Sequence, residues 1–168
     1  HFIDLTEEGE LRPYNHLLPN DTTYTRFPIV DCGAPKNIES VQRLLLRIEE
    51  LKKMDGYVYV HCWGGVGRTG TIVACYLSQN WEEPDLNHTL EVLRRNFSEM
   101  PKSAYRETPE TKEQIDFIEQ FINSNKVYKE DKAKRVPDSI RGCLMAGAAG
   151  DALGYEVEFM SRRSILSR

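Results

Sequence analysis

The chain has 168 residues, of which 40% are hydrophobic and 29% are charged, so it is long enough to bury one sizeable core. Its formal net charge of −4 gives no global electrostatic support for a nucleic-acid partner. No apolar run approaches the roughly 18 residues of a membrane span, and the four cysteines lack disulfide or metal-ligand spacing. We therefore expect a soluble protein of a reducing, cytoplasmic compartment that binds neither nucleic acid nor membrane.

The first third of the chain alternates extended and helical patterns. Residues 1–6 and 24–30 each predict a strand. Apolar side chains recur at helical spacing over residues 37–54, and the Asp-Gly pair at 55–56 provides a stop. Residues 57–60 are again apolar and predict a third strand.

Three further helices are predicted after the third strand. One begins at about residue 71, and a second is capped by Asp85. The third begins at Thr108-Pro109-Glu110, with Pro109 in its first turn. Helices that alternate with extended segments predict an α/β fold, in which helices flank a central, mostly parallel sheet.

Residues 61–70, His-Cys-Trp-Gly-Gly-Val-Gly-Arg-Thr-Gly, join the third strand to the next helix. The backbone N–H groups of such a turn can form an anion-binding nest, and the helix directs its positive end at the same place. Arg68 can add a bidentate fork for two phosphate oxygens, and the positive surroundings favour the thiolate of Cys62. The segment predicts a phosphate receptor with a nucleophile in its floor. The expected phosphate-binding residues are Trp63, Gly64, Gly65, Val66, Gly67 and Arg68.

Two other phosphate-binding patterns fit this segment less well. Residues 65–70 also match the Gly-x-Gly-x-x-Gly fingerprint of dinucleotide sites. A βαβ unit then needs a second apolar strand soon after the helix, whereas residues 80–85 read Asn-Trp-Glu-Glu-Pro-Asp. A Walker loop is excluded because the chain contains no Gly-Lys-Ser/Thr.

His61-Cys62-x-x-Gly65-x-x-Arg68-Thr69-Gly70 resembles the signature of the cysteine-based protein tyrosine phosphatase superfamily. Over about residues 1–125 the chain is most similar to the dual-specificity branch. The resemblance implies that Cys62 attacks phosphorus and forms a phosphocysteine, while Arg68 holds the equatorial oxygens. It also implies that His61 orients the loop and tunes the thiolate, and that Thr69 hydrogen-bonds the sulfur as it leaves the intermediate.

The resemblance further implies a metal-independent phosphomonoester hydrolase with no cofactor, acting on a phosphorylated protein or a small phosphomonoester. Hydrolysis through a covalent intermediate needs a proton donor and later a base. Asp31, with Pro35 after it, resembles the general-acid loop of the dual-specificity branch, although an aspartate before glycine is also common in turns. Low-molecular-weight phosphatases carry the acid downstream of the nucleophile, which argues against them here.

Gln114 is a further candidate. The segment Thr108-Pro109-Glu110-Thr111-x-x-Gln114 resembles the final segment of the phosphatase family, where a glutamine helps to place the hydrolytic water. A surface position for Gln114 fits the sequence equally well.

The composition changes after residue 124. Residues 125–136 are polar and charged and predict a linker between a phosphatase domain over 1–124, entered after its usual start, and a segment over 137–168. From about residue 136 the chain resembles the opening of ADP-ribosylglycohydrolases, which implies a truncated, all-α N-terminal fragment of such a domain. Only Glu158 of its magnesium site would lie in this chain, so Mg is expected only for the full-length hydrolase domain.

Two alternatives remain open from the sequence. The first 124 residues could act as a phosphate-binding pseudophosphatase that regulates or scaffolds an attached ADP-ribosylglycohydrolase. A fusion also links substrates, so an active phosphatase could remove phosphate from an ADP-ribose or nucleotide derivative instead of from phosphotyrosine.

Overall fold

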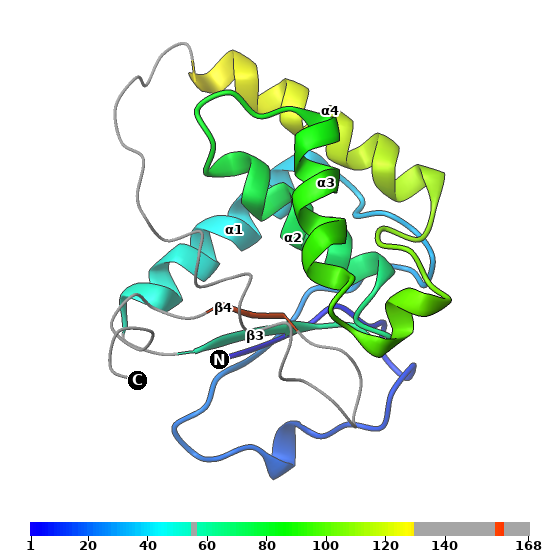
Figure 1. Cartoon of the computed structure of the whole chain (residues 1–168). Helices are drawn as coiled ribbons and strands as arrows, with labels where there is room; N and C mark the ends of the chain where they lie inside the picture. Colours follow the sequence, from blue (N-terminus) through cyan, green and yellow to red (C-terminus); the bar gives the residue numbers. More distant parts are fainter. Residues whose placement is uncertain (55–56, 130–156, 160–168) are drawn as a thin grey trace.

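The computed structural model describes residues 1–54, 57–129 and 157–159 (Figure 1). Three parallel strands, β1 (Phe2–Asp4), β2 (Tyr24–Arg26) and β3 (Val58–His61), lie in the order β2-β1-β3. A short strand, β4 (Val157–Phe159), pairs antiparallel with β3. The predicted α/β class with a mostly parallel sheet is therefore confirmed.

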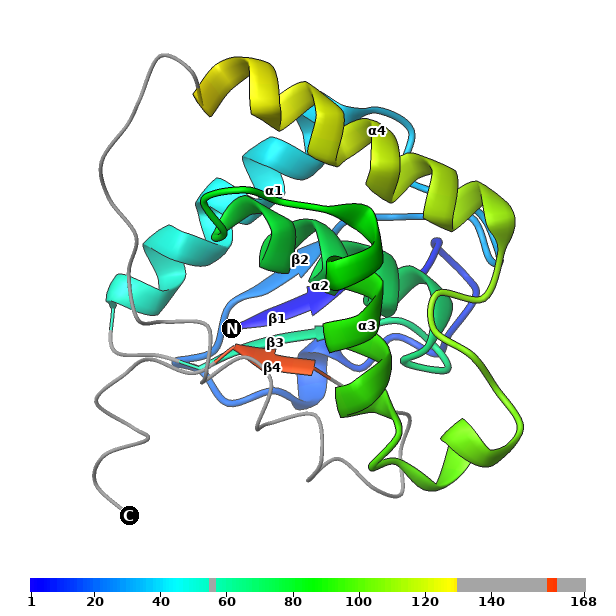
Figure 2. The same ribbon diagram turned by 45° about the horizontal axis from the view of Figure 1, so that its top comes forward.

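Four α-helices of the described part cover one face of this sheet (Figures 1 and 2). They are α1 (Ile38–Lys53), α2 (Gly67–Gln79), α3 (Leu86–Phe97) and α4 (Lys112–Lys129). The loop after β1, with the 3-10 turn η1 (Asn15–Leu17), lies on the other side, and a second 3-10 turn, η2 (Pro101–Ala104), precedes α4.

Helix α2 lies at the centre of the helical layer, in contact with α1, α3, α4 and β3. Every residue from Gly67 to Ser78 is buried, because small and apolar side chains occupy most positions on all faces of the helix. It starts four residues before the predicted position, so the end of the glycine-rich segment is already helical. The N-terminus of a rigid core helix therefore lies at the phosphate loop.

Helices α1 and α3 begin close to their predicted starts, and a capping residue lies at each start. The Asn37 side chain accepts a hydrogen bond from the Ser40 N–H (2.8 Å) at the start of α1. The Asp85 carboxylate accepts one from the His88 N–H (2.8 Å) at the start of α3. Both side chains satisfy backbone N–H groups that have no partner within the helix. The Asp-Gly stop predicted at 55–56 lies outside the described residues.

The predicted start of the last helix is wrong. Helix α4 begins at Lys112 rather than at Thr108, and Pro109 precedes it. Thr111 Oγ1 accepts from the Gln114 N–H, and Gln114 Oε1 accepts from the Thr111 N–H, both at 3.3 Å. This reciprocal pair is a capping box, and the Thr-x-x-Gln spacing that signals it was present in the sequence.

The C-terminal segment differs from its prediction where it is described. Helix α4 continues to Lys129, into the predicted linker over 125–136, and Gln42 of α1 donates a hydrogen bond to Asn125 (2.8 Å). Residues 157–159 form a strand within the segment expected to be all-α, because Val-Glu-Phe suits an extended backbone and the edge of β3 offers pairing partners. The rest of 137–168 lies outside the described residues.

The parallel sheet decides where the loops meet. Strands β1, β2 and β3 run in one direction, so their carboxyl ends lie at one edge of the sheet. The segments that follow them carry Glu10, Asp31 and Cys62 respectively. Residues far apart in the chain therefore come together beside the N-terminus of α2.

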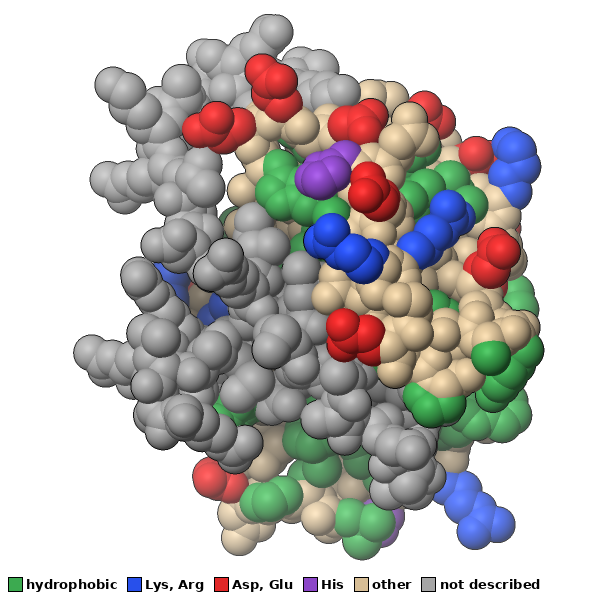
Figure 3. Space-filling model, viewed as in Figure 1, with side chains coloured by type: hydrophobic (Ala, Val, Ile, Leu, Met, Phe, Trp, Pro, Cys, Tyr) green, Lys and Arg blue, Asp and Glu red, His purple; other side chains and the backbone are tan. Residues whose placement is uncertain are grey.

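Two further features of the described residues are the character of their helices and the distribution of their charges. No helix in the described ranges is long and apolar enough to cross a membrane. Acidic and basic side chains are interspersed over the described residues on the face that Figure 3 shows.

Candidate active site

Cys62 lies at the bottom of a cup formed by the connection between β3 and α2. It is 5% exposed, and its Sγ accepts hydrogen bonds from the Gly65 N–H (3.2 Å) and the Thr69 hydroxyl (3.1 Å). Gly65 has a φ of 62°, a left-handed conformation that favours glycine and turns the N–H inward. These donors and the N-terminus of α2 are placed to stabilise negative charge on the sulfur.

Arg68, in the first turn of α2, is 2% exposed. It joins the phosphate loop to the loop after β1, which carries Glu10, and to the loop after β2, which carries Asp31. Its Nη1 and Nη2 donate to the two carboxylate oxygens of Glu10 (2.7 and 2.6 Å), and Nη1 also donates to the Ile29 carbonyl (3.1 Å). Nη2 lies 2.9 Å from Asp31 Oδ1. Burial opposes the charge, but the Glu10 hydrogen bonds and the charges of Cys62, Glu10 and Asp31 outweigh it and raise the pKa of Arg68.

Sequence reasoning missed Glu10, the main partner of Arg68. The hydrogen bonds from Arg68 hold the pKa of the Glu10 carboxyl below its ordinary value, although burial opposes this shift. Glu10 follows Gly9, whose φ of +84° shapes the turn. No local pattern separates Glu10 from its neighbours Glu7 and Glu8, because its role depends on where the loop after β1 meets α2.

Asp31 lies at the rim of the same cup. Its side chain is 60% exposed and forms an ion pair with Arg68, so the predicted acid, arginine and nucleophile all belong to one site. The next residue, Cys32, has a φ of 57° and is exposed, which marks a sharp turn in the loop. The exposure of Asp31 leaves its carboxyl accessible to a bound substrate.

His61 supports the cup from the end of β3. Its Nδ1 lies 3.1 Å from the Cys62 carbonyl, and since a carbonyl can only accept, Nδ1 carries the proton of this bond. Its Nε2 is hydrogen-bonded to the Tyr14 hydroxyl, a partner that the sequence did not reveal. His61 is buried and thus ties the backbone of the nucleophile to the loop after β1.

The other residues of the glycine-rich loop divide into inner and outer positions. Thr69 is fully buried against the sulfur, and Val66 packs with Phe97 and Met100. Trp63 is 62% exposed, so it lies on the rim rather than under the loop.

A second group of residues, from the segment after α3, supports the loop from outside. Lys102, buried in η2, donates a hydrogen bond from Nζ to the Gly64 carbonyl. The Thr108 hydroxyl donates to the Val66 carbonyl (2.8 Å). Neither residue was predicted as part of the site, since they lie about forty residues away in the chain. Their contacts arise only when η2 and the loop that follows it pack against the phosphate loop.

Gln114 is fully buried and connects α4 to the acid loop. Its Oε1 accepts from the backbone N–H groups of Glu110 (2.9 Å) and Thr111, and its Nε2 donates to the Gly33 carbonyl (3.0 Å). A Cβ on Gly67 would lie 2.9 Å from Nε2, so the amide also lies against the phosphate loop. The surface position left open by the sequence is excluded.

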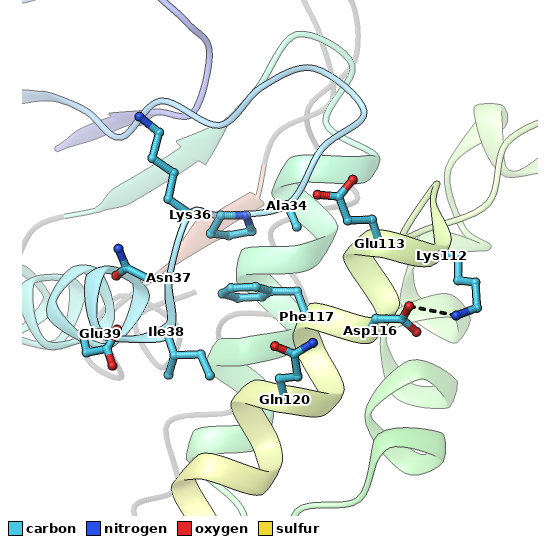
Figure 4. Close-up of a pocket in the computed structure, with 11 residues that line it drawn as sticks. Ala34, Lys36, Asn37, Ile38, Glu39, Lys112, Glu113, Asp116, Phe117 and Gln120 are labelled. Atoms are coloured by element: carbon cyan, nitrogen blue, oxygen red, sulfur yellow. Dashed lines mark hydrogen bonds and ion pairs between the residues drawn. The ribbon is translucent and has the colours of Figure 1, made fainter.

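A separate cavity of about 620 Å³ lies between the acid loop and α4 (Figure 4). Ala34 and Ile38 line it together with Phe117, and charged side chains surround this apolar patch. None of Cys62, Arg68 or Asp31 lines it, so it is distinct from the catalytic cup. Within the described ranges, no cluster of three or more His, Cys, Asp or Glu side chains could hold a metal ion.

A buried cysteine at the floor of a glycine-rich loop, an arginine in the following helix and an aspartate on an upstream loop define a class of protein. It is the class of cysteine-dependent protein tyrosine/dual-specificity phosphatases, whose members need no metal ion. Within it, the chain belongs to the family described as the Swiss Army Knife protein, DSP-PTPase phosphatase domain (PTP-SAK), whose model matches residues 1–118. Residues 131–168 match the ADP-ribosylglycohydrolase family, so both resemblances predicted from the sequence are confirmed.

Similar proteins include two from invertebrate iridescent viruses. The putative tyrosine phosphatase 067L of Invertebrate iridescent virus 3 is 40% identical over 84 residues, which are 46% of this chain and 33% of that protein. The putative tyrosine phosphatase 197R of Invertebrate iridescent virus 6 is 31% identical over 134 residues, which are 75% of this chain and 44% of that protein. The chain thus spans less than half the length of these relatives.

Solved structures of Tk-PTP share the fold. A mutant form of Tk-PTP superposes with a TM-score of 0.62 at 26% sequence identity, over 75% of this chain and 78% of that one. The active form gives a TM-score of 0.57, also at 26% identity, over 73% and 77%.

Proposed function

We propose that the chain hydrolyses phosphomonoesters as a protein tyrosine/dual-specificity phosphatase, without a metal ion and through a phosphocysteine intermediate. The observation that carries this proposal is the convergence of Cys62, Arg68 and Asp31 at one edge of the sheet. The proposed substrates are phosphorylated proteins and small phosphomonoesters, in a reducing, cytoplasmic compartment where a thiolate nucleophile persists.

In the first step the Cys62 thiolate attacks phosphorus, an S–P bond forms and the ester P–O bond breaks. Asp31 donates its proton to the leaving oxygen. In the second step the Asp31 carboxylate takes a proton from water, the water oxygen attacks phosphorus and the S–P bond breaks. The hydrogen bond from Thr69 then stabilises the departing thiolate.

Arg68 holds the equatorial phosphoryl oxygens, together with backbone N–H groups over residues 63–68. We assign Glu10 the role of orienting the guanidinium, because it accepts from both Nη atoms. The substrate phosphate then takes the place that Asp31 occupies on Arg68 and frees its carboxyl for proton transfer. His61 holds the loop, and Gln114 would place the water with the Nε2 proton that does not bond Gly33.

Release of product from para-nitrophenyl phosphate without added metal tests the proposal. We expect turnover that a chelator leaves unchanged within about twofold, because every charge placed on the phosphate comes from protein groups. The measurement is the initial rate with and without chelator. Absence of turnover, or restoration by a divalent ion after chelation, would contradict the mechanism and favour a phosphate-binding module.

Replacement of the proposed acid, Asp31→Asn, is expected to lower kcat for a phosphotyrosine peptide by about 10²-fold. The loss should be smaller with para-nitrophenyl phosphate, because para-nitrophenolate leaves readily without a proton. Asp21→Asn, an exposed carboxyl in another turn, is the matched control. Equal losses on both substrates would show that Asp31 supports the loop and does not donate the proton.

The match of residues 131–168 to ADP-ribosylglycohydrolases favours a second candidate, in which the phosphatase removes phosphate from an ADP-ribose or nucleotide derivative. Turnover of phosphotyrosine peptides with none of ADP-ribose phosphates would exclude it. The hydrolase itself, with Mg, is proposed for a longer protein only, since Glu158 alone cannot complete a magnesium site.

A further inference from the structure

An additional cation, Arg106, lies on the rim of the cup outside the residues assigned above. Its Nη1 is 3.9 Å from the position that a Cβ on Gly64 would occupy, which places the guanidinium against the phosphate loop. The side chain is 42% exposed, and Nη2 pairs with Glu110. Within the described ranges, Nη1 and Nε of Arg106 donate no hydrogen bond, so one edge of the guanidinium remains available to a ligand.

Arg106 lies between Gly64 of the phosphate loop and Glu110 of the segment before α4. The hydrogen bond that it donates to Glu110 raises the pKa of Arg106, so the guanidinium stays charged beside the loop. Two large aromatic side chains flank the same stretch of chain, Tyr105 at 75% exposure and Trp63 at 62%. Tyr105 precedes Arg106 and Trp63 precedes Gly64 in the chain, so this side of the rim offers a partly exposed cation to an anionic ligand.

The other cations near the loop are already committed to internal partners. Arg68 is 2% exposed and its fork contacts Glu10, Ile29 and Asp31. Lys102 is 6% exposed and donates to the Gly64 carbonyl. A second anion on a substrate would therefore meet Arg106 before either of these.

We infer that Arg106 is a specificity residue that binds a second anionic group of the substrate, and that the preferred substrates are phosphotyrosine peptides with an acidic residue directly after the phosphotyrosine. The inference rests on the proposed function. Neighbouring residues of an extended peptide lie about 3.3 Å apart along the chain, so the flanking carboxylate can reach the rim while the phosphate occupies the cup. That carboxylate takes the available edge of Arg106 or replaces Glu110 on it.

The test compares two phosphotyrosine peptides that differ only in Asp or Asn after the phosphotyrosine. We expect the unmodified chain to favour the Asp peptide about fivefold to tenfold in kcat/KM, mainly through KM, as fits a partly exposed charge pair. Arg106→Gln should remove this preference and leave kcat/KM for the Asn peptide unchanged. Arg106→Lys should keep part of the preference. Arg43→Gln, an exposed arginine on α1, is the matched control and should change neither peptide.

Two further measurements keep the inference falsifiable. Glu110→Gln removes the carboxylate that competes for Arg106, so it should raise the ratio of kcat/KM for the Asp peptide to kcat/KM for the Asn peptide. This variant tests the inference even when Arg106→Gln does not fold. Peptide binding to a Cys62→Ser variant reads the same preference without turnover, so that a failure of the proposed chemistry is distinguished from a failure of this inference. Equal losses on both peptides, or an unchanged ratio in Arg106→Gln and in Glu110→Gln, would overturn it. If Arg106→Gln lowered turnover of ADP-ribose phosphates alone, the second anion would belong to a nucleotide, and the proposed peptide preference would be overturned.

Discussion

Substitution of Cys62 by serine is expected to reduce turnover of para-nitrophenyl phosphate by about 10⁴-fold or more, the scale seen when a covalent nucleophile is removed. A serine hydroxyl keeps the size of the side chain and can still accept from Gly65 and Thr69. It is not ionised at neutral pH and is a much weaker nucleophile than a thiolate. The folded cup should therefore remain while the chemistry stops.

The measurement is single-turnover and steady-state kinetics, with phosphate binding as a check that the cup is intact. Cys32→Ser is the matched control: this thiol is exposed and adjoins Asp31, and its replacement should leave kcat within about threefold. Cys75 is not expected to contribute, because complete burial raises the pKa of its thiol. Activity that survives Cys62→Ser but disappears on chelation would replace the thiolate mechanism by a metal-dependent one.

Substitution of Arg68 by lysine is expected to lower kcat/KM by about 10²–10³-fold, although the positive charge is kept. Lysine presents a point charge and cannot form two parallel hydrogen bonds to phosphate. Its three donors radiate from one nitrogen and cannot serve all four oxygens that Arg68 contacts on Glu10, Ile29 and Asp31, so the loops lose part of their shared partner. The loss should appear in kcat as well as in KM, because the fork stabilises charge that develops in the transition state.

Steady-state kinetics on para-nitrophenyl phosphate measure this effect, and thermal unfolding shows whether the variant is folded. Arg43→Lys, on the exposed surface of α1, is the control and should behave like the unmodified chain. A change of less than about fivefold for Arg68→Lys would mean that charge alone suffices and that the bidentate geometry has no catalytic role.

Local patterns predicted much of the scaffold. The apolar spacing over residues 37–54 placed the start of α1, and the cap at Asp85 placed the start of α3, since both signals depend on residues close together in the chain. The last helix was placed too early because Thr108-Pro109 competes with a second start signal, the capping box at Thr111 and Gln114. The strand at 157–159 could not be foreseen, because three residues form a strand only where a sheet edge is available.

The sequence by itself determined the class of protein and the position of the phosphate loop. Cys62, Gly65, Arg68 and Thr69 lie within one continuous segment between a strand and a helix, so spacing along the chain is enough to predict their contacts. The tertiary structure alone decided what surrounds that segment. Four contacts around it join distant parts of the chain. They are Glu10 with Arg68, Lys102 with Gly64, Gln114 with Gly33, and Arg106 with the rim at Gly64. Such contacts follow from the order and direction of the strands, from the packing of α4 on α2 and from the contact of η2 with the phosphate loop, which no local spacing encodes.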